Sequence, residues 1–176
     1  PTLGDLDFNA QQILDAAQRA AKQGAKLLVT PELSLTAYPP EDLLLRASFI
    51  DTVSRKLEQL ATELAIFEEL RVIVGHPQRS TDGLQNAASV LHQGKIIATY
   101  AKQRLPNHEV FDEVRYFVPG HQPCVFEIDG HRVGLIICED AWHSAPAAMA
   151  KHAGAELLVI PNASPYHLQK HVVRED

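Results

Sequence analysis

One pattern occurs twice in this chain, as GAKLLVTPE at 24–32 and as GAELLVIPN at 154–162. In each copy a segment with helical periodicity ends at Gly-Ala, and a short apolar run follows that closes on proline and a polar residue. A continuous apolar run of this length is typical of a strand buried on both faces. A helix-to-strand unit used twice predicts a layered α/β fold with helices packed on a sheet.

The rest of the chain adds elements of the same kinds. Residues 8–23, 41–47, 49–70 and 141–154 have helical spacing of apolar residues, and 71–77 (RVIVGHP) has the pattern of a second buried strand. Gln93-Gly94 and Asp129-Gly130 each separate two apolar segments and predict β-hairpins. Because no linker or low-complexity stretch divides the chain, we treat residues 1–176 as one domain.

Charge and hydropathy exclude several classes of protein. The formal net charge is −6, and no cluster of Lys and Arg supplies the basic footprint that binding to nucleic acid requires. No apolar run approaches the roughly 20 residues of a membrane-spanning helix. Two cysteines are too few for a disulfide framework. A chain without such a framework is typical of a reducing compartment, so we expect a cytoplasmic location.

Polar residues end three of the predicted strands, at Glu32, Cys138 and Asn162. Ligands of layered α/β folds bind outside the carboxyl ends of strands, so these side chains are candidates for one site. A cysteine nucleophile needs a base such as Glu32, or a cation such as Lys102, because its thiol is mostly protonated at neutral pH. The alternative is a core cysteine, and for Cys124, which lacks acidic neighbours, we favour that structural role.

Metal binding is not expected. His167 and His171 are four residues apart, but Gln169 and Lys170 stand between them where a zinc site on a helix has glutamate beside the first histidine. The phosphate-binding glycine motifs GxGxxG and GxxxxGK[ST] do not occur.

Three blocks of sequence resemble the nitrilase, or carbon–nitrogen hydrolase, superfamily: LLVTPELSLTAYPPEDLL, YAKQRLPNHEVFDEVRYFVPG and VGLIICEDAW. Motifs within these blocks, followed by NASPYHLQK, are most similar to the glutaminase domains of glutamine-dependent NAD synthetases, and they occur in the order of that family. The resemblance implies a nitrilase-like α-β-β-α sandwich, and it implies that the sequence is incomplete at both ends.

The same resemblance implies roles for individual residues. Glu32 would be the general base, Cys138 the nucleophile, and Lys102 with the backbone N–H of Glu139 the donors to the oxyanion. Glu113 aligns with an additional glutamate near the lysine, and Glu109 is the alternative for that role. The expected substrate-binding residues are His108, where the family usually has tyrosine, together with Glu139, Ser164 and Lys170, and Arg174 is a further candidate.

The implied partners follow from the family. L-Glutamine would be hydrolysed to glutamate and ammonia, and the ammonia would amidate deamido-NAD. No cofactor is expected in this chain, whereas ATP and Mg²⁺ are expected at a synthetase domain that the sequence does not contain. A homo-oligomer is expected by analogy. The alternatives are a free-standing amidase that acts on another carboxamide and a catalytically silent assembly domain.

Overall fold

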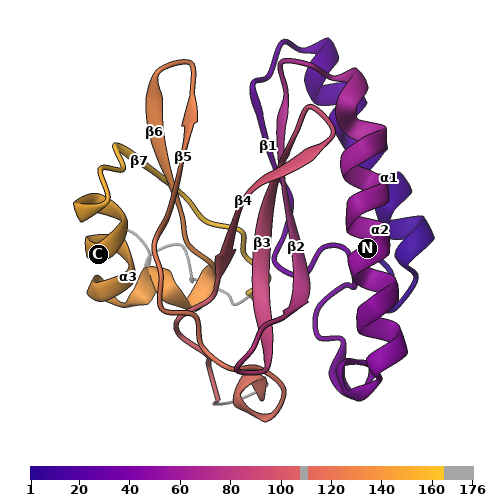
Figure 1. Ribbon diagram of the computed structural model, residues 1–176, viewed down its shortest axis with the longest axis vertical. Coiled ribbons are helices and arrows are strands. Elements are labelled where there is room, and N and C mark those ends of the chain that lie inside the picture. The colour runs from indigo at the N-terminus through magenta and orange to yellow at the C-terminus, as the bar shows by residue number, and fades with distance from the viewer. Residues whose placement is uncertain (108–110, 165–176) are drawn as a thin grey trace, which may run out of the picture.

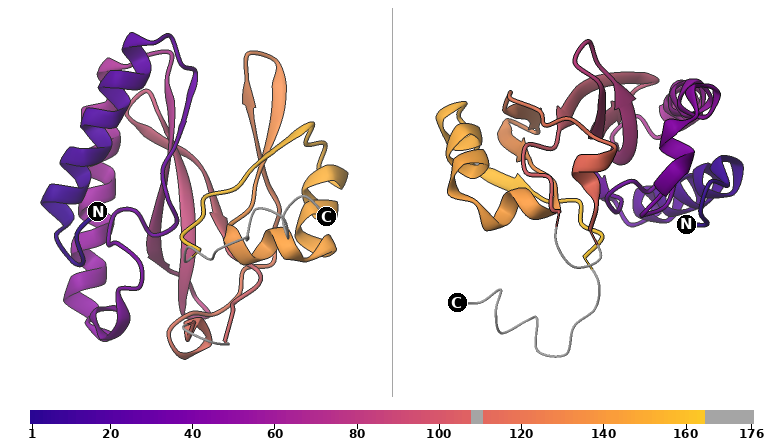
Figure 2. Two further views of the ribbon diagram at one scale, coloured as in Figure 1. Left: turned by 180° about the vertical axis from the view of Figure 1, so that it is seen from behind. Right: turned by 90° about the horizontal axis from the view of Figure 1, so that it is seen from below.

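The computed structural model describes residues 1–107 and 111–164 and has four layers in the order α-β-β-α (Figure 1). Helices α1 (Leu6–Lys22) and α2 (Ala47–Glu63) cover one sheet, and α3 (Ser144–His152) covers the other. The view from below in Figure 2 shows the two sheets between these helical layers. The predicted α/β sandwich is therefore confirmed.

The strands form two mixed sheets. The first has the order β1-β2-β3-β4 and the second the order β5-β6-β7. The strands are β1 (Leu27–Val29), β2 (Arg71–Arg79), β3 (Leu84–His92), β4 (Lys95–Ala101), β5 (Cys124–Ile128), β6 (His131–Leu135) and β7 (Leu157–Val159). Strands β1 and β7 pair in parallel with β2 and β6, and the other pairs are antiparallel.

Both predicted hairpins are confirmed. Gln93 and Gly94 connect β3 to β4, and Asp129 and Gly130 connect β5 to β6. All four residues have positive φ, between 47° and 84°, as a two-residue turn of this twist requires.

The repeated pattern also forms the same structure twice. Gly24 (φ 74°) and Gly154 (φ 93°) end α1 and α3 in the left-handed region. The alanine after each glycine donates its N–H back into the helix, from Ala25 to Ala20 O and from Ala155 to Ala150 O, both at 3.0 Å. Each unit thus turns from helix into a strand by the same hydrogen bonds.

The strands of these two units are less buried than predicted. Val29 in β1 is 38% exposed and Leu157 in β7 is 58% exposed. The prediction of burial on both faces is wrong here because, within the described residues, β1 and β7 lie at sheet edges with one hydrogen-bonded neighbour each. β2, which lies between β1 and β3, is buried as predicted.

Two helix predictions also need correction. The segment 41–47 forms a 3₁₀ helix, Glu41–Leu45, and the extended backbone of Arg46 separates it from α2. The predicted helix 49–70 ends at Glu63, because a short 3₁₀ helix, Leu64–Ile66, and a turn lead into β2.

Apolar side chains of β2 divide between two cores. Val72 and Val74 pack with α1 and α2, whereas Ile73 faces the second sheet and packs with Phe126 and Leu135. The alternation follows from the two-residue period of a strand. The core between the two sheets includes side chains of β4 and β6 and so holds these two strands in position. Both strands lead to the predicted site.

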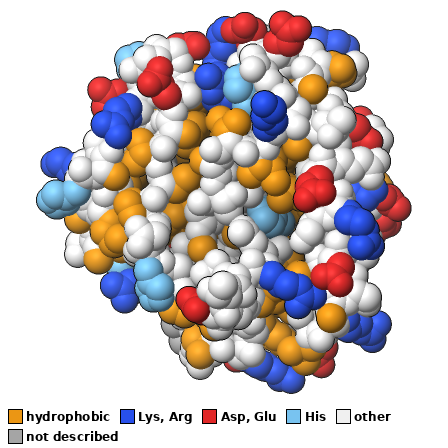
Figure 3. Space-filling view, viewed as in Figure 1, with side chains coloured by type: hydrophobic (Ala, Val, Ile, Leu, Met, Phe, Trp, Pro, Cys, Tyr) orange, Lys and Arg blue, Asp and Glu red, His pale blue; other side chains and the backbone are white. Residues whose placement is uncertain are grey.

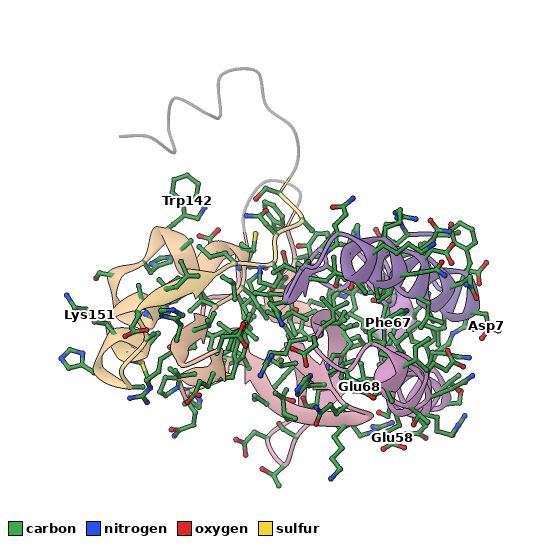
Figure 4. The ribbon with its side chains drawn as sticks, turned by 90° about the horizontal axis from the view of Figure 1, so that it is seen from above. Asp7, Glu58, Phe67, Glu68, Trp142 and Lys151 are labelled. Atoms are coloured by element: carbon green, nitrogen blue, oxygen red, sulfur yellow. The ribbon has the colours of Figure 1, made fainter. Side chains whose placement is uncertain are left out.

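The surface carries charges of both signs. On the face in Figure 3, hydrophobic side chains reach the surface over the region where the two sheets meet, and acidic and basic side chains lie around them. In Figure 4, Asp7 and Glu58 lie on the side of the helical pair, and Trp142, which is 46% exposed, projects from the side of α3. Within the described parts of the chain, none of the helices has the length and hydropathy to span a membrane.

A buried histidine in β2 makes stability depend on pH. His76 is 3% exposed, its ring nitrogens lie 2.7 Å from Ser89 Oγ and 3.2 Å from Pro77 O, and burial lowers its pKa to about 4. Below about pH 6.5 the unfolded chain binds a proton that the folded chain does not. We expect His76 to remove about 2 kcal/mol from the free energy of unfolding between pH 7.5 and pH 5.

Urea unfolding at both pH values checks this prediction. His76→Gln should flatten the dependence on pH, because it removes the titrating group. His131→Gln is the control, since the side chain of His131 is 79% exposed and its removal should keep the wild-type dependence. Equal pH dependence in His76→Gln and the wild type would contradict the assignment.

Candidate active site

Glu32 lies in the turn that follows β1. This turn packs against Gly75 of β2, where a Cβ atom would lie 2.4 Å from Leu33 N, so only glycine permits the approach. Leu35 N donates to Gly75 O at 3.0 Å and holds the turn in place. The Glu32 side chain is directed inward and is 1% exposed.

Lys102 follows β4 and is fully buried. Its ammonium donates to Glu32 Oε1 at 2.6 Å and to Glu113 Oε1 at 2.7 Å. Burial alone would lower the pKa of Lys102, but the two carboxylates outweigh it and raise the pKa above its ordinary value. Lys102 is therefore a permanent cation between two acids.

Glu113 begins a short 3₁₀ helix, Glu113–Arg115, and is 4% exposed. Burial raises its pKa, and Lys102 opposes that effect. The hydroxyl of Tyr38 donates to Glu113 Oε1 at 2.9 Å. Asn86 of β3 donates its amide to Glu32 Oε1 at 2.8 Å and lies 3.4 Å from Glu113 Oε2.

Cys138 is the first residue of a 3₁₀ helix, Cys138–Trp142, three residues after β6. Its φ of 45° is in the left-handed region, and its N–H donates to Pro161 O at 3.0 Å. The Sγ atom lies 3.5 Å from both Asn162 Oδ1 and Ser164 Oγ. This left-handed turn directs the thiol toward the segment that follows β7.

The charges of Glu32 and Lys102 also act on the thiol. Burial raises the pKa of Cys138, and the charge of Glu32 raises it further, while Ser164 and Lys102 act in the opposite direction. The thiol is therefore protonated at neutral pH, and a reaction at sulfur needs a base.

Asp140 connects the cysteine turn to the lysine strand and is fully buried. Its Oδ1 accepts the N–H groups of Gln103 and Arg104 at 3.1 and 2.8 Å. Its Oδ2 accepts the hydroxyl of Tyr100 at 2.8 Å and the N–H of Ile137 at 3.0 Å. One carboxylate thus holds the residues next to Cys138 and next to Lys102 at a fixed separation.

We expect Asp140→Asn to weaken both the fold and the site. An amide has one acceptor oxygen, so donors that now share the carboxylate would face an NH₂ group. The free energy of unfolding should fall by about 3 kcal/mol. Reactivity at Cys138 should fall at least tenfold, measured as the rate of alkylation by iodoacetamide.

Tyr100→Phe is the matched control, because it removes one of the four donors to Asp140. It should lower the free energy of unfolding by about 1 kcal/mol. If Asp140→Asn unfolds no earlier than Tyr100→Phe, the role of Asp140 as the connection is wrong.

The described residues that the sequence singled out form two groups of contacts. Glu32, Lys102 and Glu113 are in direct contact, and Cys138 contacts Ser164. The side chain of Glu139 lies 3.4 Å from His143 Nε2. Several predicted residues lie outside the described ranges: His108, Glu109, His167, Lys170, His171 and Arg174.

Sequence reasoning missed three contacts of the site. Asn86 lies just before the predicted hairpin arm 87–91, and Tyr38 is part of the TAYPPED block without a role of its own. Asp140 was considered only as an acidic neighbour of the cysteine. β3 begins three residues earlier than predicted, at Leu84, and so includes Asn86. A polar side chain in a buried strand is a signal for a site, because buried polar groups need partners.

Two pockets lie beside these residues. One of about 300 Å³ is bounded by Tyr38 and Glu113 at the site and by Asp42 and Tyr116 farther out. The other, of about 710 Å³, is lined by Glu139, His143 and the segment 103–107. Among residues 1–107 and 111–164, no group of three His, Cys, Asp or Glu side chains could hold a metal ion.

Comparisons with known proteins identify the family of the chain. The chain belongs to the carbon-nitrogen hydrolase family, whose model matches residues 1–174. It is 43% identical over 176 residues to a glutamine-dependent NAD(+) synthetase of Xylella fastidiosa, and 39% identical over 177 residues to that of Aquifex aeolicus. These alignments cover 98% and 99% of the chain but 32% and 30% of the relatives, so the chain spans about a third of their length.

Solved structures give the same result. The glutamine-dependent NAD+ synthetase of Acinetobacter baumannii, in complex with ADP, superposes with a TM-score of 0.90 at 35% identity, over 99% of this chain and 33% of that one. An amidase of Nesterenkonia sp. AN1, shown after Michael addition of acrylamide at its active-site cysteine, superposes with a TM-score of 0.80 at 27% identity. The superposition covers 97% of this chain and 66% of the amidase.

Proposed function

We propose that this chain is a glutaminase domain that hydrolyses L-glutamine and supplies ammonia for the amidation of deamido-NAD. The observation that carries the proposal is the buried Lys102, held by Glu32 and Glu113 within electrostatic reach of the Cys138 thiol. The relatives are named glutamine-dependent NAD synthetases, which supports glutamine as the amide substrate.

The proposed reaction begins with proton transfer. Glu32 takes the proton of Cys138, and Sγ attacks the side-chain carboxamide carbon of glutamine. The oxyanion is held by the Lys102 ammonium and by the N–H of Glu139, which has no partner within its helix because it lies in the first turn. Donors already in place are expected to lower the barrier because they need no reorganisation.

The remaining steps return the enzyme to its starting state. The tetrahedral intermediate collapses, the proton on Glu32 passes to the leaving nitrogen, and ammonia departs. Water then gives its proton to Glu32 and attacks the γ-glutamyl thioester. Glutamate leaves as the sulfur recovers its proton from Glu32.

The proposal includes residues and partners beyond the site itself. Ser164, 3.5 Å from Cys138 Sγ, and Lys170 would recognise the amino-acid end of glutamine, and His108 would lie near the glutamine pocket. Since the relatives are about three times as long, the deamido-NAD, ATP and Mg²⁺ would bind to a synthetase domain outside this chain. A homo-oligomer remains a proposal by analogy.

Ammonia release from the full-length protein tests the proposed substrate. L-Glutamine should be hydrolysed at least a hundredfold faster than propionamide, and binding of deamido-NAD and ATP should stimulate the reaction. The glutamine mimic 6-diazo-5-oxo-L-norleucine should leave one adduct, on Cys138, in mass spectrometry. Labelling at Cys124, or no labelling, would contradict the proposal.

A free-standing amidase is the second candidate, and the likeness to the Nesterenkonia amidase favours it. Such an enzyme would hydrolyse small amides as fast as glutamine and would not respond to nucleotides. The same assay therefore decides between the two functions. A catalytically silent assembly domain would release ammonia from none of these amides.

A further inference from the structure

Asn86 is a fully buried polar residue in the middle of the site, on the strand beside the one that carries Lys102. Its backbone oxygen accepts the N–H of Lys102 at 2.8 Å. Its side chain reaches the two acids that hold the lysine, at 2.8 Å from Glu32 Oε1 and 3.4 Å from Glu113 Oε2. Asn86 therefore contacts both carboxylates through its side chain and the main chain of Lys102 through its own backbone.

The donors divide unequally between the two acids. Glu32 Oε1 accepts hydrogen bonds from both Lys102 and Asn86. Among the described residues, none donates a hydrogen bond to Glu32 Oε2. Glu113 has both oxygens occupied, Oε1 by Lys102 and Tyr38 and Oε2 by Asn86. Only Glu32 thus keeps a carboxylate oxygen available for a proton.

The orientation of the Asn86 amide agrees with this division. Its Oδ1 is buried and has no partner among the described residues, which costs free energy. Rotating the amide would bring Oδ1 against two carboxylates, so the charges fix the NH₂ group on their side. Few buried acceptors in proteins are left unpaired, so the position of this amide needs an explanation other than packing.

We propose that Asn86 is the positioning residue that holds Glu32 with Oε2 free to take the proton of Cys138. The amide is suited to this task because it is a neutral donor. It binds both carboxylates without adding a charge to the lysine and its two acids. The inference rests on the proposed function only in taking Cys138 as the group that reacts.

The test uses Asn86→Ala, which removes the amide donors, and Asn86→Asp, which keeps the shape and replaces the donors by a third carboxylate. The readouts are the rate of Cys138 alkylation by iodoacetamide against pH, and kcat and KM for glutamine. Both variants should lower kcat at least tenfold and change KM less than threefold. The midpoint of the alkylation profile should move upward by at least one pH unit, farther in Asn86→Asp.

Ser89→Ala is the matched control on the same strand. Ser89 is 1% exposed and contacts His76 and Thr99, so its loss removes buried hydrogen bonds outside the site. This variant should unfold earlier and keep the wild-type alkylation profile. If the Asn86 variants behave like Ser89→Ala, with lower stability but unchanged pH profile and kcat, the proposal is overturned.

The two readouts separate this inference from the proposed function. Alkylation needs no glutamine. If the wild type releases no ammonia but the Asn86 variants show the shifted alkylation profile, only the glutaminase assignment is removed. A wild type that hydrolyses glutamine with Asn86 variants of equal kcat would remove only the role of Asn86.

Discussion

Cys138→Ala is expected to release no ammonia from glutamine above the uncatalysed background, because the variant has no atom that can form the thioester. The other cysteine cannot substitute for it. Cys124 lies in β5 between the two sheets, is 7% exposed, and burial raises the pKa of its thiol to about 11. An ammonia electrode or a coupled assay on the full-length protein measures the loss.

Two further variants make this result specific. Cys124→Ala should keep the rate of ammonia release within twofold, although it loses core contacts and should lower the free energy of unfolding by about 1–2 kcal/mol. Cys138→Gly should be as inactive as Cys138→Ala but about 1 kcal/mol more stable, because the φ of 45° at this position favours glycine. Ammonia release by Cys138→Ala at the wild-type rate would show that the nucleophile is assigned wrongly.

The sequence predicted those parts of the fold that depend on local pattern. The two hairpins follow from Gln93-Gly94 and Asp129-Gly130, which supply the positive φ of a tight turn. The repeated Gly-Ala segments predicted two equivalent helix-to-strand units, and the same capping hydrogen bonds occur in both. In each case the information lies within a few residues of the element that it specifies.

What the sequence did not predict depends on which strands become neighbours. An apolar run predicts a strand, but the exposure of β1 and β7 follows from their places at the edges of their sheets. Similarly, Asn86 of β3 meets Glu32, which follows β1, because β2 pairs with both strands and sets their register.

The roles of the acids illustrate the same limit. Resemblance placed Glu32, Lys102 and Glu113 near one another, and the structure adds that the lysine lies between the two carboxylates. Which oxygens remain open for chemistry depends on Tyr38 and Asn86, whose side chains converge from a loop and a strand. The spacing of residues along the chain does not predict which side chains meet in this way.

Lys102→Met should have the largest combined effect on stability and activity. The variant keeps a long side chain in the site but leaves Glu32 and Glu113, 1% and 4% exposed, facing each other without a cation. The free energy of unfolding should fall by about 3–5 kcal/mol. Ammonia release should fall more than a thousandfold, because the oxyanion loses a charged donor and Glu32 loses one of its two supports.

The double variant Lys102→Met with Glu113→Gln separates the two effects. Neutralising Glu113 removes the repulsion, so at least half of the lost stability should return while ammonia release stays absent. Lys26→Met is the surface control: its ion pair with Glu69 has the same 2.6 Å length, but both side chains are exposed, so stability should change by less than about 1 kcal/mol. A drop in ammonia release of tenfold or less in Lys102→Met would contradict its role at the oxyanion, whatever happens to stability.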